Sequence, residues 1–261
     1  AMLAPPPYQS LAGDDAGFKR RQFEVRDFGK WVETNVAAHK QPGYAIANIS
    51  LKPAGGIPGD ATAEQMDAVA TLAERFSFGE IRVTHEQNLV LPHVRQADLH
   101  ELWRGLGQHD LATPNLGLIS DIIACPGMDY CSLASARSIP VAQRIGERFA
   151  SLERQHDIGE LKVKISGCIN ACGHHHVGHI GLLGVDRKGE EFYQITLGGS
   201  ADEHASIGDI VGPAFSYDDV VDAFETIVDT YVHIRNHGES FIETYRRVGK
   251  HPFKESLYVT H

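Results

Sequence analysis

The sequence lacks the features that mark membrane, secreted and nucleic-acid-binding proteins. No apolar run approaches the roughly 20 residues that a membrane helix needs. The first residues do not place a basic segment before an apolar one, so no secretory signal is expected. Basic residues are also in deficit, with 24 Lys and Arg against 34 Asp and Glu and a formal net charge of −10. That balance argues against binding to nucleic acid or to an anionic membrane. We therefore expect a cytoplasmic protein with neither partner, in which an anionic ligand needs a local basic pocket.

Cysteine is scarce, and all four cysteines lie in the second half of the 261-residue chain. Without a secretory signal, four cysteines argue against a disulfide framework and favour metal binding or redox chemistry. The length allows one large domain or two ordinary ones, each with its own hydrophobic core. No low-complexity segment or obvious repeat divides the chain further.

The first half alternates between strand and helix patterns. Residues 1–23, which contain three consecutive prolines, have the composition of an arm or linker. Thr62 and Gln65 have the spacing of a capping box at the start of an apolar helical stripe. Periodicity predicts strands over 43–51 and 80–94, the second one interrupted around Gln87, and helices over 62–76 and 96–106. This order indicates an α+β arrangement on a mixed sheet.

The second half repeats the alternation around the cysteines. One predicted strand runs into Cys125, and a helix is predicted over 132–152. Two more helices are predicted after capping pairs, the first after Ser216 with Asp219 and the second after Ser240 with Glu243. Further strands are predicted over 160–166, 179–187 and 190–199.

The cysteines form two pairs, Cys125-x5-Cys131 and Cys168-x3-Cys172, each in a loop at the end of an element. Zinc sites mostly use two to four intervening residues in both pairs, so the first spacing suits zinc poorly. An iron–sulfur cubane is larger than one ion and accepts wider, unequal spacing. Glycines beside the cysteines allow tight turns and bring backbone N–H groups close to sulfur. Zinc, a cubane and four unligated thiols remain as alternatives from spacing alone.

The cysteine motifs CPGMDYC (125–131) and SGCINACGHHH (166–176) resemble those of the siroheme and [4Fe-4S] nitrite and sulfite reductases. The segments IRVTHEQNLVL (81–91) and ITLGG (195–199) resemble the same family. The resemblance implies a ferredoxin-like half-domain over 24–116, after the arm, and an α/β siroheme- and cluster-binding domain over 117–261. Both domains would be built of mixed sheets with helices, giving an α+β fold.

The resemblance assigns the four cysteines to metal. Cys125, Cys131 and Cys168 would hold a [4Fe-4S] cluster, and Cys172 would hold the cluster and also bridge to the siroheme iron. One sulfur shared by two redox centres would let electrons pass between them with almost no gap.

Further residues are implied as siroheme contacts. Asn170 matches an asparagine that the family places against the macrocycle; a simple turn residue is the alternative. His174, the first of three consecutive histidines, would contact siroheme carboxylates or a partner surface, unless these histidines are solvated or core residues. Lys162 and Lys164 alternate along a strand and would bind the same carboxylates, unless they lie on a solvated face.

Arg82 and Gln87 resemble the cofactor-binding strand R-x-T-x-R-Q of the family, but Glu86 replaces its second arginine. These reductases consist of two related halves, of which the first supplies most substrate-binding cations and the second the cluster cysteines. The chain therefore resembles the second, C-terminal half of a bacterial assimilatory sulfite reductase hemoprotein. Catalytic residues would lie mostly in the first half, so this chain by itself would be incomplete for turnover, and either cofactor could be missing from it.

The resemblance implies an oxidoreductase of sulfur assimilation that takes six electrons from a flavoprotein or ferredoxin and reduces sulfite to sulfide. Reduction of nitrite to ammonia is the alternative within the family. A non-catalytic module whose cysteines hold zinc is the alternative outside it, and iron with acid-labile sulfide, as opposed to zinc, would distinguish the two.

Overall fold

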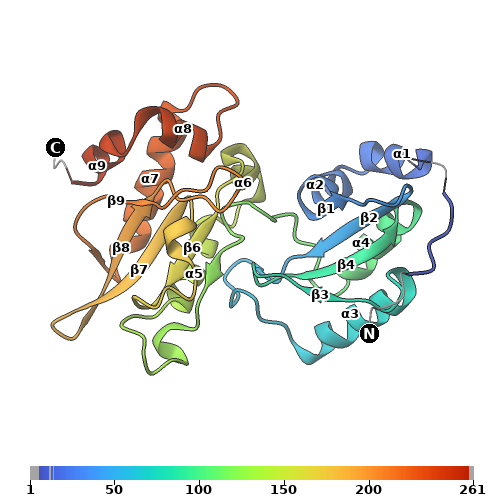
Figure 1. The fold of residues 1–261 in the computed structure, drawn as a ribbon, viewed down its shortest axis with the longest axis horizontal. Helices are drawn as coiled ribbons and strands as arrows, with labels where there is room; N and C mark the ends of the chain where they lie inside the picture. The colour runs from blue at the N-terminus through green and yellow to red at the C-terminus, as the bar shows by residue number, and fades with distance from the viewer. Residues whose placement is uncertain (1–5, 12, 14, 259–261) are drawn as a thin grey trace. The chain divides into compact units, whose positions relative to one another are not determined.

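A computed structural model describes residues 6–11, 13 and 15–258. The chain divides into two compact units, the first covering residues up to 53 together with 59–116, and the second covering 54–58 together with the chain from Gly117 onwards (Figure 1). Each unit has its own sheet and its own hydrophobic core. In the described part of the chain, no helix is long and apolar enough to span a membrane.

The first unit is a four-stranded antiparallel sheet with helices. The strands are β1 (Val36–Ala38), β2 (Tyr44–Ile49), β3 (Arg82–Val83) and β4 (Leu89–Arg95), in the order β1-β2-β4-β3. The helices are α1 (Ala16–Glu24), α2 (Arg26–Asn35), α3 (Ala63–Phe76) and α4 (Leu99–Gly107), with a short 3₁₀ turn η1 (Gln96–Asp98). Apolar residues of α2, α3 and α4 share one core with β2 and β4. The combination of helices and a sheet agrees with the predicted α+β class, but this sheet is antiparallel and not mixed as expected for the first half.

The predicted elements of the first unit are confirmed with small shifts. Thr62 and Gln65 form a complete capping box at the start of α3, each side chain accepting a backbone N–H of the other residue. The interrupted strand is the hairpin of β3 and β4, and Gln87 in its turn has a φ of +60°. Residues 16–23, which the sequence places in an arm, belong to helix α1.

The second unit is a mixed sheet covered by helices. Its strands are β5 (Ile123–Ala124), β6 (Val163–Ser166), β7 (Ile180–Arg187), β8 (Glu190–Leu197), β9 (Asp209–Ile210) and β10 (Phe215–Ser216). Its helices are α5 (Ile139–Arg148), α6 (Leu152–Ile158), α7 (Val220–Ile234), α8 (Phe241–Val248) and α9 (His251–Tyr258), with 3₁₀ turns η2 (Gly127–Asp129) and η3 (His175–Val177). The order is β10-β8-β7-β6-β5, with β9 also on β8. Strands β5, β6 and β7 are parallel to one another, and β8 is antiparallel to β7.

The predicted helix over 132–152 is wrong, because α5 covers only Ile139–Arg148. The segment before it is held in a turn, in which the backbone N–H groups of Ser135 and Ala136 both donate to the carbonyl oxygen of Gly167. Pro140 lies in the first turn of α5, where its missing N–H costs nothing. These long-range contacts override the local helical pattern.

Of the two capping pairs predicted in the second unit, one is confirmed. Ser240 and Glu243 form a complete capping box at the start of α8. Ser216 and Asp219 do not cap a helix, because α7 begins one residue after Asp219, and Asp219 makes no side-chain capping bond. Instead the Ser216 hydroxyl donates to the Asp219 carboxylate at 2.6 Å, just ahead of α7.

The two faces of the second sheet differ in what covers them. Val163 and Ile165 of β6 belong to the core shared with α5 and α7 (Figure 1). Lys164 alternates with them and therefore points to the opposite face. There a Cβ on Gly178 would lie 3.1 Å from the Lys164 Cβ, so the chain after Cys172 runs back over this second face.

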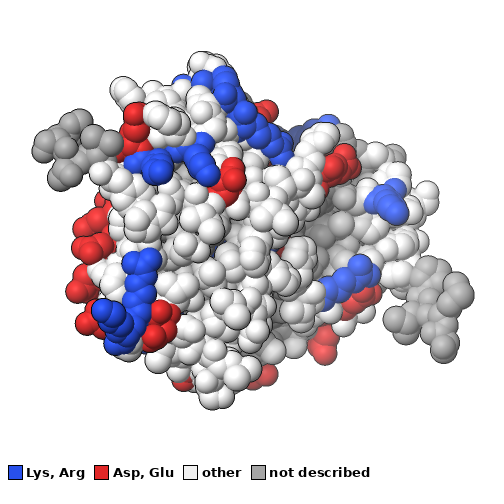
Figure 2. Space-filling view, turned by 60° about the vertical axis from the view of Figure 1, so that its left-hand side comes forward, with Lys and Arg blue, Asp and Glu red and all other residues white. Residues whose placement is uncertain are grey.

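Several surface charges are paired. Arg148 and Arg154, from α5 and α6, both reach Glu225 on α7, and Arg137 pairs with Glu191 at 2.8 Å. Figure 2 shows the same mixture on one face, where basic side chains lie beside acidic ones.

Candidate functional site

The two cysteine loops leave neighbouring parallel strands at the same edge of the second sheet. Cys125 directly follows β5, and Cys168 lies two residues after β6. Because β5 and β6 are parallel, their carboxyl ends meet at one edge, which is the usual position of a site in such sheets. All four cysteines are free thiols, three half-buried and Cys172 exposed.

Backbone hydrogen bonds join the two loops around Cys125. Its N–H donates to the Ile165 carbonyl oxygen at 3.1 Å, and its sulfur accepts the N–H of Gly167 at 3.1 Å. The Ser138 hydroxyl lies 3.3 Å from the same sulfur. The first cysteine loop is thus attached to the second one before any ligand is considered.

Three glycines make this close approach possible. A Cβ on Gly167 would lie 2.6 Å from the Ala136 carbonyl oxygen and 3.0 Å from the Gly127 Cα. A Cβ on Gly127 would lie 2.5 Å from the Ser138 nitrogen, and Gly127 has a φ of +61°. A Cβ on Gly173 would overlap the carbonyl oxygen of Ile165. Side chains at these positions would force the loops apart.

Strained backbone surrounds Cys172. Ala171 and His174 have φ values of +56° and +53°, in the left-handed region that non-glycine residues rarely adopt. Asn170, for which a turn residue was the alternative above, is exposed and is not among the positive-φ residues. Strain of this kind persists where the surrounding structure imposes it, and it concentrates at functional sites.

The histidines after Cys172 differ in burial. His174 and His176 are exposed, whereas His175 is 1% exposed and its Nδ1 atom has no hydrogen-bond partner among the described residues. Burial, together with a smaller effect of the neighbouring His176, lowers the pKa of His175 to about 4. The sequence drew attention to His174 and missed His175, because nothing in three consecutive histidines marks which one the chain buries.

The two predicted lysines also differ. Lys162, one residue before β6, pairs with Glu160 at 3.2 Å and is partly exposed. Lys164 is 4% exposed, on the sheet face that the chain after Cys172 covers. A buried lysine needs anionic or polar partners, so Lys164 is the more constrained of the two.

Arg82 and Gln87 belong to the first unit, where Arg82 is engaged locally. Its Nε donates to Glu80 at 2.6 Å, and this hydrogen bond holds the pKa of Glu80 below its usual value. Glu80 also bonds to the buried His93 at 3.1 Å, and His93 bonds to the Tyr8 hydroxyl at 2.9 Å. This row of hydrogen-bonded side chains was not predicted from the sequence, because the residues come from distant segments.

The donor set at the sheet edge suits a cluster better than a single ion. Across residues 6–11, 13 and 15–258, no three His, Cys, Asp or Glu side chains lie close enough together to hold one metal ion. A cubane needs four thiolates at separate corners, together with hydrogen-bond donors to sulfur. Four free thiols, the Gly167 N–H on Cys125 and the glycine-lined approach of the loops fit that requirement.

The fold and the site define an α+β protein with a thiolate-rich loop pair at the carboxyl edge of parallel strands. A family model described as "Nitrite and sulphite reductase 4Fe-4S domain" matches residues 118–259. A second one, described as "Nitrite/Sulfite reductase ferredoxin-like half domain", matches residues 49–109. The chain therefore belongs to the nitrite and sulfite reductase family, a family of oxidoreductases with siroheme and [4Fe-4S] cofactors.

Relatives carry both substrate names. The chain is 30% identical to sulfite reductase [ferredoxin] 2 of Mycolicibacterium paratuberculosis over 67% of this chain and 33% of that protein. It is 27% identical to the chloroplastic ferredoxin–nitrite reductase of Arabidopsis thaliana over 76% of this chain and 33% of that protein. The solved structure of Mycobacterium tuberculosis NirA superposes with a TM-score of 0.68 at 26% identity, over 84% of this chain and 41% of NirA. The chain thus spans a third to two-fifths of these proteins.

Proposed function

We propose that this chain is the cluster-bearing, C-terminal half of a siroheme-dependent sulfite reductase. In it Cys125, Cys131, Cys168 and Cys172 are the ligands of a [4Fe-4S] cluster. The observation that carries this proposal is the N–H···S bond from Gly167 to Cys125, which ties the two cysteine loops together at one sheet edge.

Cys172 is proposed as the thiolate shared between the cluster and the siroheme iron. It is the exposed member of the four, whereas the other three are half-buried. A sulfur that serves two centres must have one side inside the cluster site and one side open to the macrocycle. The strained residues Ala171 and His174 would fix its direction.

The residues that the sequence suggested as siroheme contacts are also the ones proposed here. Asn170 and His174 flank Cys172 on its exposed side, and Lys162 and Lys164 would neutralise carboxylates of the macrocycle. Arg82 and Gln87 are proposed contacts from the first unit. If Arg82 binds siroheme, its guanidinium must contact the siroheme carboxylates while it keeps its ion pair with Glu80.

Sulfite is proposed as the substrate and nitrite as the alternative. The motif SGCINACGHHH resembles bacterial sulfite reductases, and the sulfite reductase quoted above is 30% identical. Nitrite reductases at 27% to 29% identity support the alternative. Several relatives are named for ferredoxin, so ferredoxin is the proposed donor, with a flavoprotein as the alternative, in the cytoplasm.

Turnover is proposed to need a first half, because the chain spans only 33% to 41% of the three proteins compared above. That half would supply the remaining wall of the siroheme site and most of the cations that bind the substrate. The cluster itself should assemble on this chain, since all four thiols belong to one unit.

Anaerobic reconstitution with iron and sulfide tests the proposal. We expect about four iron and four acid-labile sulfide per chain, as a cubane requires, and no stoichiometric zinc. Siroheme bands and sulfite-dependent oxidation of a reduced dye should appear only with a first half present, and sulfite should then be turned over faster than nitrite. Zinc in place of iron and sulfide would refute the cluster assignment.

A further inference from the structure

Ser138 occupies an unusual position at the start of α5. It is fully buried and is the residue before the first turn of the helix, yet its side chain makes no capping hydrogen bond. Serine at this position normally accepts a backbone N–H from the first turn. Ser151 and Ser240 do so at α6 and α8 in the same unit.

The hydroxyl of Ser138 faces Cys125 instead, with 3.3 Å between Oγ and Sγ. Its backbone is in the right-handed helical region, with φ −101° and ψ −41°, whereas the capping serine Ser151 is extended, with φ −67° and ψ 107°. The backbone at Ser138 therefore directs its hydroxyl away from the helix end and toward the thiol.

Space for this hydroxyl comes from two glycines. A Cβ on Gly127 would lie 2.9 Å from the Ser138 Oγ, and a Cβ on Gly167 would lie 3.0 Å from it. Gly167 also donates its N–H to the same sulfur at 3.1 Å. The thiol of Cys125 is thus met by a backbone N–H and by a hydroxyl in a tightly packed pocket.

The residue before Ser138 is fixed to strand β8. Glu191 accepts the Arg137 backbone N–H at 2.7 Å and its guanidinium Nε at 2.8 Å. The Tyr193 hydroxyl donates to the Arg137 carbonyl oxygen at 2.8 Å. Both backbone groups of Arg137 are therefore anchored, so the Ser138 hydroxyl is held in place by a network outside the cysteine loops.

We propose that Ser138 is a positioning residue that donates a hydrogen bond to the Cys125 thiolate and so raises the reduction potential of the cluster. The inference rests on the proposed cluster function. A ligated thiolate only accepts hydrogen bonds, so the hydroxyl must be the donor. Donors to cluster sulfur stabilise the more negative, reduced state and are one of the protein's means of setting the potential. Cys125 would then be the cluster ligand through which this chain sets the reduction potential.

The test compares reconstituted wild-type protein with Ser138→Ala. A redox titration followed by electron paramagnetic resonance should give a lower midpoint potential for Ser138→Ala, and one exchangeable proton coupling to the cluster should disappear in deuterium exchange experiments. Ser151→Ala is the matched control, because it removes a hydroxyl that does cap a helix. It should lower thermal stability and leave the potential and the proton couplings unchanged.

A second variant covers the case in which Ser138→Ala fails to hold the cluster. Tyr193→Phe removes the hydroxyl that holds the Arg137 carbonyl oxygen, without a change of charge and without touching either cysteine loop, and it should shift the potential in the same direction by a smaller amount. Wild-type potentials and couplings in variants that retain full iron and sulfide would overturn the role of Ser138. Failure of the wild-type protein itself to take up iron and sulfide would instead refute the proposed cluster function.

Discussion

Gly173 lies so close to the carbonyl oxygen of Ile165 that a Cβ at position 173 would overlap it. The Gly173 N–H also donates to the buried Ser166 hydroxyl at 3.2 Å. The residue directly after Cys172 is therefore packed against the backbone of β6. The direction in which Cys172 points depends on this contact, since the chain must turn here to run back over the sheet.

Gly173→Ala is expected to destabilise the second unit strongly. Its Cβ meets backbone that cannot move without breaking β6, so the loss should reach about 3 kcal/mol or more, at the upper end of overpacking effects. Urea unfolding followed by circular dichroism measures it. Gly146→Ala in α5 is the matched control, because its Cβ would make an ordinary contact at 3.6 Å with Gly55. It should be neutral or stabilising by up to about 1 kcal/mol, as alanine replaces glycine in a helix.

His179 should make the second unit sensitive to acid. Burial lowers its pKa to about 4, and the opposing pull of Glu160 does not restore it. Its Nδ1 accepts the Lys162 N–H at 3.2 Å, and its ring stacks on Phe241, so protonation would remove an acceptor inside the core. The folded state resists a proton that the unfolded chain takes up near pH 6.5. The contribution of neutral His179 to the free energy of unfolding is therefore fully present above pH 6.5 and declines as the pH falls. By pH 4 the free energy of unfolding has decreased by roughly 3 kcal/mol through this group.

Urea midpoints between pH 7 and pH 4 measure this effect. His179→Gln should show a shallower decline over that range, because the titrating group is gone. His237→Gln, at an exposed position, should decline like the wild type. Equal slopes in all three proteins would show that His179 titrates normally in the folded state.

Much of the fold was predictable because its signals are local. A capping box needs only two residues three apart, and both complete boxes begin helices at the predicted positions. The fold class followed from the alternation of strand and helix patterns, and the cysteine motifs pointed to the family. The first cysteine loop was expected at a strand end, where Cys125 lies.

What the sequence missed depends on contacts between distant segments. The start of α5 is set by hydrogen bonds to Gly167, about 30 residues further on. The role of Ser138 depends on the same loop, and a serine before Ile-Pro reads simply as a helix cap. The burial of His175 and Lys164 depends on the chain crossing back over β6. No periodicity within one element records these relationships.

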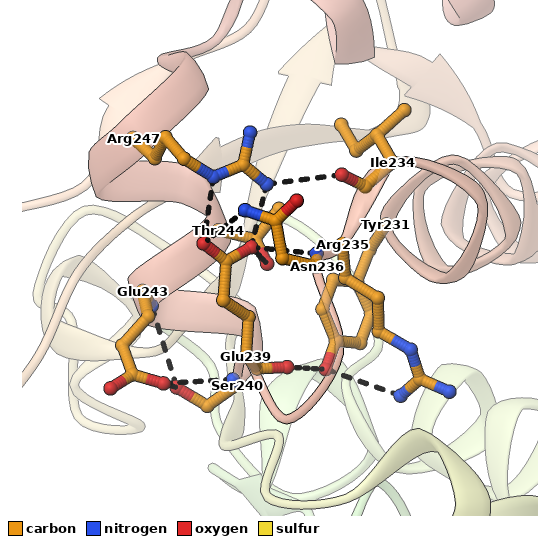
Figure 3. A network of polar contacts seen from close by, with 9 residues as sticks. All are labelled: Tyr231, Ile234, Arg235, Asn236, Glu239, Ser240, Glu243, Thr244 and Arg247. Carbon is orange, nitrogen blue, oxygen red and sulfur yellow. Dashed lines mark hydrogen bonds and ion pairs between the residues drawn. The ribbon is translucent and has the colours of Figure 1, made fainter.

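Glu239 should hold the connection between α7 and α8 in one conformation (Figure 3). Its carboxylate accepts hydrogen bonds from Arg247 at 2.6 and 2.7 Å, from the Asn236 backbone at 2.9 Å and from Thr244 at 3.1 Å. The hydrogen bond from Arg247 is the main reason that its pKa lies well below the usual range. The carboxylate therefore stays ionised well into acid, and this contribution to stability is lost only below the ordinary carboxylate pKa.

Glu239→Gln should speed amide hydrogen exchange over residues 235–240 while the strands keep their protection, because one acceptor and the charge are removed. Mass spectrometry of exchanged peptides measures this. Glu255→Gln on α9, whose carboxylate makes an exposed pair with His251 at 3.4 Å, should leave exchange unchanged. Uniform acceleration across the unit would indicate global destabilisation rather than a local anchor.

Cys172→Ser separates the proposed role of Cys172 as the shared thiolate from any role in folding. Because Cys172 is exposed and its sulfur is a free thiol, replacing it should change the stability of the cluster-free protein by no more than about 0.5 kcal/mol, as for other surface substitutions. With a first half and siroheme present, the same variant should lose the electronic coupling between cluster and siroheme, seen as altered siroheme bands and altered paramagnetic resonance. Cys125→Ser is the informative comparison, because its sulfur accepts the Gly167 N–H and its loss should disturb the cluster without removing the bridge. An unchanged cofactor spectrum in Cys172→Ser would exclude Cys172 as the bridging ligand and leave the coupling to another residue.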